Sequence, residues 1–176
     1  MTRPTPYLSN LRFAYADPPY PGQARRHYAD QPVCQEVNHS ILIGTLEAHY
    51  PDGWALSTSS PALRQVLPLC PPGVRAMAWV KPFASFKPGV NPGYCWEPVL
   101  VMGGRKLGRE VPTVRDWVSA NITLKRGMPG AKPLEFCFWL FRVLGIQAGD
   151  SLDDLFPGSG AITQALDIYQ RQGRLV

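Results

Sequence analysis

The sequence has no arrangement of cysteines that indicates a disulfide framework or a metal site. Four cysteines are scattered through 176 residues, with no CxxC pair and no Cys/His cluster at the spacing of zinc ligands. They are Cys34, Cys70, Cys95 and Cys137. We therefore expect reduced thiols, no bound metal and a cytoplasmic location, in a bacterium or a phage-infected cell.

Long apolar runs, internal repeats and low-complexity tracts are also absent from the sequence. No run approaches the roughly 20 apolar residues that cross a bilayer, and residues 1–10 lack the apolar core of a signal peptide. We therefore expect no membrane partner. Acidic residues are the minority among the charged ones, with 13 Asp and Glu against 18 Lys and Arg, a formal net charge of +5. This excess favours an anionic partner such as nucleic acid.

Apolar residues are plentiful, at 45% of the chain, which is enough for one well-packed domain over residues 1–176. Short apolar runs alternate with helical patterns, punctuated by 19 prolines and 16 glycines. Alternation of this kind predicts an α/β fold, with a compact, mostly parallel sheet of about five strands and helices on both faces. Expected strands cover residues 11–16, 54–58, 74–80, 98–102 and 151–156, and expected helices lie within 33–49, 61–69, 134–144 and 161–171.

Two irregular segments separate these elements. Residues 82–97 are rich in proline, glycine and aromatic residues, and residues 103–131 are basic, with an apolar-bearing stretch at 117–124. We interpret both as substrate-facing loops, while a plain solvated loop remains an alternative for residues 103–131.

The first motif that carries chemistry is Asp17-Pro18-Pro19-Tyr20, at the end of the first expected strand. Adjacent prolines make the backbone rigid, so the Asp17 carboxylate and the Pro18 carbonyl can both face one amino group while Tyr20 offers an aromatic face. By itself, the motif is equally compatible with a simple turn.

The second motif is the segment DLFPGSG, residues 154–160, where a strand ends in an acidic residue and a glycine turn opens a helix. Glycines allow the backbone to approach a ligand closely, and a helix N-terminus offers unpaired N–H groups. A glycine turn after a strand is a weak signal when it stands alone.

Together, the two motifs resemble those of the DNA amino-methyltransferases. In that family a D/N/S-PP-Y/F/W tetrapeptide holds the target amine and a D-x-F-x-G-S-G loop binds S-adenosylmethionine. Here the tetrapeptide comes first, an order similar to the circularly permuted, beta-type enzymes and to the adenine methyltransferases that act on messenger RNA. The segments WVKP (79–82), 93–102 and KPLE (132–135) fall in the same order.

The resemblance implies a Rossmann-like methyltransferase fold and a role for each matching residue. Asp17 and the Pro18 carbonyl would accept hydrogen bonds from N6 of adenine, Pro19 would stiffen the loop and Tyr20 would stack on the base. The methyl group would pass by direct displacement, without a covalent enzyme intermediate. Expected cofactor-binding residues are Ala16, Asp17, Lys132, Glu135, Asp154, Phe156, Gly158, Ser159 and Gly160. Expected substrate-binding residues are Tyr20, Arg25, Arg26, Lys81, Lys87, Arg105 and Lys106.

Within this family DPPY usually accompanies adenine N6 methylation, so DNA adenine is the expected substrate, with RNA as an alternative. The resemblance also implies a further strand carrying an acid for the cofactor ribose, which has no counterpart before Val176. The ribose site would then be open, supplied by another segment of the chain, or completed by a second copy or a different subunit. A non-catalytic nucleic-acid-binding subunit is the alternative from another class of protein, but erosion of either motif, its expected mark, is not seen.

Overall fold

The chain is described here by a computed structural model over residues 10–21, 37–83, 88–122 and 131–173. The strands are β1 (Arg12–Ala16), β2 (Gly53–Ser57), β3 (Arg75–Val80), β4 (Trp96–Gly103), β5 (Trp117–Ser119) and β6 (Ser151–Asp154). The helices are α2 (His39–His49), α3 (Leu63–Val66), the 3-10 turn η1 (Leu67–Leu69), α4 (Leu134–Leu144) and α5 (Ala161–Gly173). The fold is therefore α/β, as expected.

The six strands form one mixed sheet in the order β5-β3-β4-β2-β1-β6. β1 pairs in parallel with β2 and β6, and β3 pairs in parallel with β5. β4 is antiparallel to both of its neighbours, β2 and β3. The expectation of about five mostly parallel strands is met in part: the sheet has six strands, and β4 runs opposite to the other five. The described residues between β3 and β4 form no crossover helix, and the short connection joins the two strands in antiparallel directions. Residues 103–131, expected to be irregular, supply β5.

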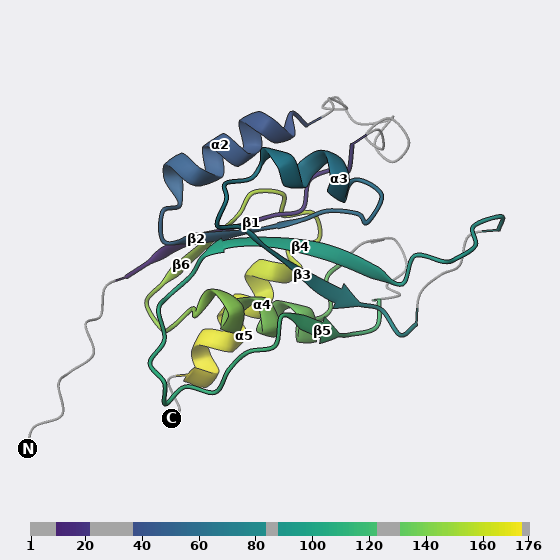
Figure 1. Cartoon of the computed structure of the whole chain (residues 1–176). Helices are drawn as coiled ribbons and strands as arrows, with labels where there is room; N and C mark the ends of the chain where they lie inside the picture. The colour runs from purple at the N-terminus through teal and green to yellow at the C-terminus, as the bar shows by residue number, and fades with distance from the viewer. Residues whose placement is uncertain (1–9, 22–36, 84–87, 123–130, 174–176) are drawn as a thin grey trace, which may run out of the picture.

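Helices cover both faces of the sheet, as the alternation predicted (Figure 1). On one face, α2 packs Ile43 and Leu46 against Trp54, Leu56 and Leu100. On the other face, α4 packs a nearly all-round apolar surface against the sheet and α5. The sheet is thus the middle of three layers. Clusters of polar residues lie at the two opposite ends of its strands.

The helix boundaries follow local capping chemistry. The first expected helix begins only at His39, because the Asn38 side chain accepts the Ile41 N–H and so caps it. α4 begins after Pro133, whose missing N–H costs nothing at this position. It ends at Gly145, which adopts the left-handed conformation with φ of 69°. No helix among the described residues is long and apolar enough to cross a membrane.

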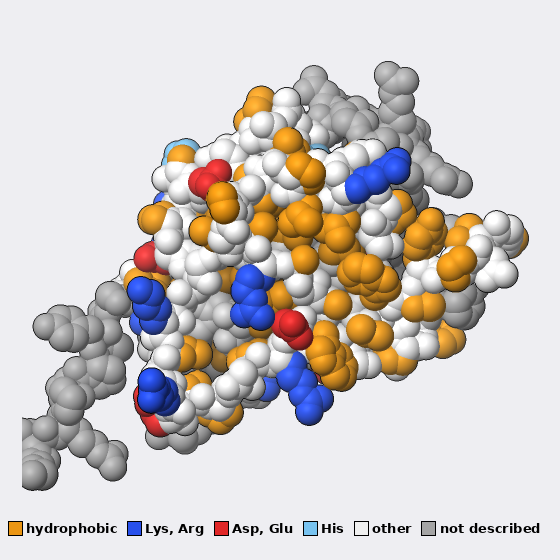
Figure 2. Space-filling view, in the orientation of Figure 1, with side chains coloured by type: hydrophobic (Ala, Val, Ile, Leu, Met, Phe, Trp, Pro, Cys, Tyr) orange, Lys and Arg blue, Asp and Glu red, His pale blue; other side chains and the backbone are white. Residues whose placement is uncertain are grey.

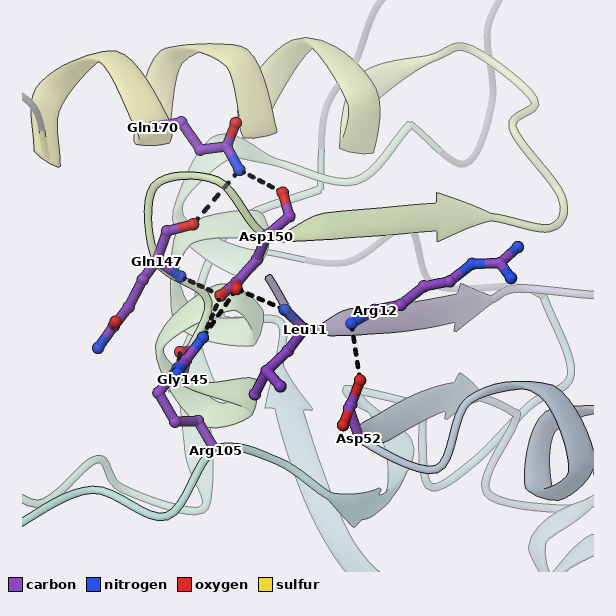
Figure 3. A network of polar contacts seen from close by, with 8 residues as sticks. All are labelled: Leu11, Arg12, Asp52, Arg105, Gly145, Gln147, Asp150 and Gln170. Carbon is purple, nitrogen blue, oxygen red and sulfur yellow. Dashed lines mark hydrogen bonds and ion pairs between the residues drawn. The ribbon is translucent and has the colours of Figure 1, made fainter. Parts of the chain in front are cut away.

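The buried carboxylate of Asp150 ties together the edge of the sheet where β1 and β6 begin (Figure 3). It accepts hydrogen bonds from the backbone N–H groups of Leu11 at 2.9 Å and Gln147 at 2.7 Å. The Arg105 guanidinium reaches both of its oxygens, at 2.7 and 2.8 Å. This network fixes the start of β1 relative to the end of α4. It therefore also helps to fix the position of the other end of β1, where the candidate site lies.

Candidate functional site

Polar side chains from four strands meet at the opposite edge of the sheet, where β1 ends. Asp17 follows β1, Asp154 is the last residue of β6 and Lys81 follows β3. Glu97 joins them because β4 runs antiparallel, which brings the start of that strand to the carboxyl ends of its neighbours. We call this the carboxyl edge. In open α/β sheets this edge is where ligands bind.

An alternating chain of acids and lysines forms the centre of the site. The Lys132 ammonium lies 3.0 Å from Oδ2 of Asp17 and 3.1 Å from Oε2 of Glu97. Lys81 contacts the other oxygen of Glu97. The Lys132 side chain is only 7% exposed, whereas that of Asp17 is 25% exposed. The inner lysine is therefore held by two carboxylates, and Asp17 lies where a ligand can reach it.

Aromatic rings form the floor beneath the two lysines. The ammonium groups of Lys81 and Lys132 lie 4.6 and 5.0 Å from the centre of the Trp79 ring. Lys132 also lies 5.6 Å from the centre of the Phe136 ring. The negative faces of these rings stabilise the ammonium groups where water is excluded. α4 thus contributes both the wall of the site, through Phe136, and the lysine that precedes it.

The pKa values in this cluster move in opposite directions. Burial raises the pKa of Asp17 above its usual range, despite the nearby Lys132. Although burial alone would raise the pKa of Glu97, the charges of Lys132 and Lys81 lower it. Burial opposes the charge of Lys132 too, but the carboxylates of Asp17 and Glu97 and the neighbouring phenols keep its pKa well above the usual value. Glu97 is thus the stably ionised partner, and Asp17 is the carboxylate that is least well compensated.

The tetrapeptide forms the mouth of this cluster. Pro18 is buried, while Pro19 and Tyr20 are half-buried. Burial raises the pKa of the Tyr20 phenol above its usual value, and the charges of Asp17 and Glu97 raise it further. Tyr20 is therefore a neutral phenol beside Asp17. Behind it, the hydroxyls of Tyr15 and Ser57 lie 2.8 Å apart and connect the ends of β1 and β2.

The glycine turn lies beside the same edge, after β6. Oδ1 of Asp154 accepts the N–H of Phe156 at 3.3 Å, and the pKa of Asp154 is raised by burial and by the charge of Asp17. Gly158 and Gly160 have φ angles of 46° and 71°, which side chains rarely adopt. Gly160 opens α5, where its carbonyl accepts the N–H of Gln164. The structure therefore brings the two sequence motifs to one edge of the sheet.

Asp153 and Asp154 face opposite sides of β6, as adjacent strand residues must. The Asp153 carboxylate accepts hydrogen bonds from Tyr50 at 2.8 Å and from Arg12 at 2.6 Å, on the α2 side of the sheet. Asp154 therefore faces the other side of the sheet, where Asp17 and Lys132 lie.

Two residues expected at the site, Arg105 and Lys106, are found elsewhere. Arg105 is at the opposite edge of the sheet, paired with Asp150, and Lys106 is exposed beside it. Glu135 is exposed in the first turn of α4. Ala16 is fully buried in β1, and Phe156 packs against the core on the α2 side. Arg25, Arg26 and Lys87 lie outside the described residues.

Glu97 is the residue of the cluster that the sequence analysis did not select. Its signal was an acid placed immediately before the apolar run at 98–102. A charged residue at that position is typical of the solvated start of a strand. Only the antiparallel direction of β4 brings it to the carboxyl edge, between two lysines.

Two of the described thiols, Cys70 and Cys137, are poorly suited to nucleophilic chemistry. Burial raises the pKa of Cys70 to about 11 and that of Cys137 to about 12, so both are neutral thiols near neutral pH. The described residues also contain no group of three or more His, Cys, Asp or Glu side chains placed to hold a metal ion. The chemistry that the arrangement supports is that of positioned carboxylates, lysines and aromatic rings.

No protein-family model matches the sequence, and no curated protein matches it. Among solved structures, the crystal structure of the M1.HpyAVI–SAM complex matches with a TM-score of 0.57. The two chains share a fold. The match covers 91% of this chain and 79% of M1.HpyAVI, at 14% sequence identity. At that identity the likeness concerns the arrangement of the backbone alone.

Proposed function

We propose that the carboxyl-edge site binds S-adenosylmethionine and transfers its methyl group to N6 of adenine in DNA. The observation that carries this proposal is the convergence of Asp17 and its rigid tetrapeptide with Asp154 and the glycine turn, from opposite ends of the chain. M1.HpyAVI, which has the same fold, was crystallised with SAM. That observation supports this choice of cofactor.

The charge balance of the site favours a cationic ligand. Asp17, Glu97 and Asp154 provide three carboxylates, against the two ammonium groups of Lys81 and Lys132. The raised pKa values of Asp17 and Asp154 reflect burial without full compensation. A bound sulfonium cation would supply the missing positive charge, and its methyl group is the group to be transferred.

On the cofactor side, Asp154 would accept hydrogen bonds from the ammonium group of the methionine part. Gly158, Ser159 and Gly160 would bring backbone close to the cofactor, and Phe156 would border it. Ala16 and Glu135 complete the proposed contacts, Ala16 through its backbone at the end of β1.

On the substrate side, Oδ2 of Asp17 contacts Lys132, and a carboxylate has a second oxygen, Oδ1, that can accept an N–H. The Pro18 carbonyl would accept the other N–H of the amine, while Tyr20 would stack on the base. The amine nitrogen would bond to the methyl carbon as the bond from that carbon to sulfur breaks, which leaves the neutral thioether of S-adenosylhomocysteine, and one proton of the amine would be released to water. Catalysis rests on holding these atoms in line.

Nucleic acid as the substrate is supported by charge and by exposed aromatic rings. The chain carries a net charge of +5. Phe83, Tyr94 and Trp96 are exposed at the ends of β3 and β4, next to Lys81. Residues 88–95 project from the sheet there (Figure 1), and hydrophobic side chains gather on that part of the surface (Figure 2). Exposed rings of this kind stack on unpaired bases, and a target adenine must leave the stack before its amine can react.

The test is transfer of labelled methyl from S-adenosylmethionine to duplex DNA, single-stranded DNA and RNA in parallel, followed by nucleoside analysis. N6-methyladenine in DNA, formed at least about a hundredfold more slowly with Asp17→Asn and at an unchanged rate with the matched surface variant Asp167→Asn, is the expected result.

The other possible results of this assay would each indicate a different function. N6-methyladenine only in RNA would replace the polymer, and N4-methylcytosine would replace the base. Nucleic-acid binding without cofactor binding would overturn the proposal in favour of a non-catalytic subunit.

A further inference from the structure

A second feature of the surface lies away from the carboxyl edge, on the face of the sheet that α4 covers. It is a solvent-open hollow of about 400 Å³, bordered by the start of β3, residues 107–115 and the end of α4. Arg75, the first residue of β3, borders the hollow, whereas Lys81, just after that strand, belongs to the site. At about 3.3 Å per strand residue, the two positions are about 20 Å apart.

Four arginines line this hollow. They come from three separate segments, and all four are exposed: Arg75, Arg109, Arg115 and Arg142. None of them takes part in an ion pair among the residues that the structure describes, where the ion pairs involve Arg12, Lys81, Arg105 and Lys132. In the lower part of the view in Figure 2, Lys and Arg side chains are spread over the surface.

Acidic groups near the hollow are fewer. Glu110 folds back against Gly108, and Asp116 precedes β5. Apolar groups complete the lining, including Leu107 and Val111, which are both exposed. Arg115 also lies over the exposed Trp117 ring, with the guanidinium carbon 5.5 Å from the ring centre. The hollow therefore combines several permanently charged forks with an apolar floor.

Guanidinium groups are suited to one class of ligand in particular. Their planar forks bind phosphate oxygens in pairs and are less strongly hydrated than ammonium groups. A cluster drawn from three segments, open to solvent, fits successive phosphates of a chain better than one small enclosed anion.

We propose that this arginine hollow binds the phosphodiester backbone of the nucleic acid whose target base enters the carboxyl edge. The inference rests on the proposed function, since it takes its polymer from there. Each strand of a duplex has one phosphate per about 3.4 Å of helix axis, so 20 Å along the axis corresponds to about six nucleotides between the target base and the hollow.

Binding of a fluorescent 20-nucleotide DNA, measured by anisotropy at several salt concentrations, tests the proposal. The double variant Arg109→Gln/Arg142→Gln removes two forks, and Arg64→Gln/Arg171→Gln is the matched control from exposed positions on α3 and α5. We expect the first variant to weaken binding about tenfold or more and to reduce the salt slope by about one for each phosphate that is no longer bound. The control should retain both values.

Length and ligand identity sharpen the same experiment. A dinucleotide is too short to span the distance from the carboxyl edge to the hollow, so its binding at the carboxyl edge should be equal in wild type and variant. Equal weakening in the control pair, or unchanged binding of the long DNA, would overturn the proposal. Inorganic phosphate that displaces the long DNA at low millimolar concentration would also overturn it, because the hollow would then be a site for a free anion. Since the readout is binding, loss of methyl transfer with normal binding counts against the proposed function alone.

Discussion

The two edges of the sheet each place an aspartate beside a basic side chain, but the surroundings of the two carboxylates differ. The Asp150 side chain is 2% exposed and accepts hydrogen bonds from two backbone N–H groups and, through both of its oxygens, from one terminal nitrogen of Arg105. The Asp17 side chain is 25% exposed and contacts Lys132 through one oxygen. Asp150 is closed on all sides by its own chain, whereas Asp17 has room for a ligand.

The difference separates a structural ion pair from one that is arranged for binding. A carboxylate with every acceptor position occupied stabilises the fold but cannot bind anything else. At Asp17 the burial that raises the pKa is not fully offset, so the ionised form is retained at a cost in stability. Substitutions at the two positions should therefore have opposite profiles.

The largest expected effect is on stability, from Asp150→Ala. This variant leaves the Arg105 charge and two backbone N–H groups without their partner, so unfolding should become easier by about 3–5 kcal/mol. Urea unfolding followed by circular dichroism measures the loss. A cost below about 1 kcal/mol would show that water replaces the carboxylate and that the contrast with Asp17 is not real.

Asp17→Asn should have the reverse profile. Replacing the charged acceptor at the reacting amine should lower kcat about 10²–10³-fold, by analogy with the removal of one transition-state hydrogen bond. The fold should lose little, because the ionised Asp17 is itself unfavourable in the folded state. Single-turnover methyl transfer and thermal unfolding on the same preparation provide both values. If stability falls as far as in Asp150→Ala, Asp17 is a structural residue.

Acidification should separate activity from stability. The pKa of Asp17 is raised in the folded protein, so protonation as pH falls through that pKa removes an unfavourable charge and does not destabilise the fold. The same protonation removes the carboxylate that methyl transfer needs as a hydrogen-bond acceptor. The pKa of Glu97 is lowered, so its contribution is present above its unfolded value of about 4.3 and is lost only as pH falls through the lower folded value. Methyl transfer should therefore fall at a pH where the circular dichroism spectrum is unchanged. Coincident midpoints for the two signals would contradict this order.

The smallest effect is expected at Asp153, the acid next to Asp154. Its partner Arg12 is well exposed, and solvent screens such pairs. Asp153→Asn should leave the unfolding midpoint and the methyl-transfer rate within experimental error, while Asp154→Asn should raise the KM for S-adenosylmethionine. Equal KM changes in the two variants would remove the proposed distinction between the two sides of β6.

The sequence by itself determined most of the elements and both motifs. Apolar runs bounded by prolines and glycines located β1, β2, β3 and the core of β4, and the KP pair located the start of α4. These features are local, since turn chemistry and the spacing of apolar residues act within a few positions. The tetrapeptide and the glycine turn were readable for the same reason.

The tertiary structure alone decided which charged residues meet. Glu97 became part of the site because β4 is inserted antiparallel between β2 and β3, and no local pattern specifies that direction. Arg105 was expected near the substrate, yet the end of the same strand brings it to the other edge, against Asp150. A basic residue has the same local signature in an ion pair, a ligand site or open solvent, so only the long-range pairing of strands determines its partner.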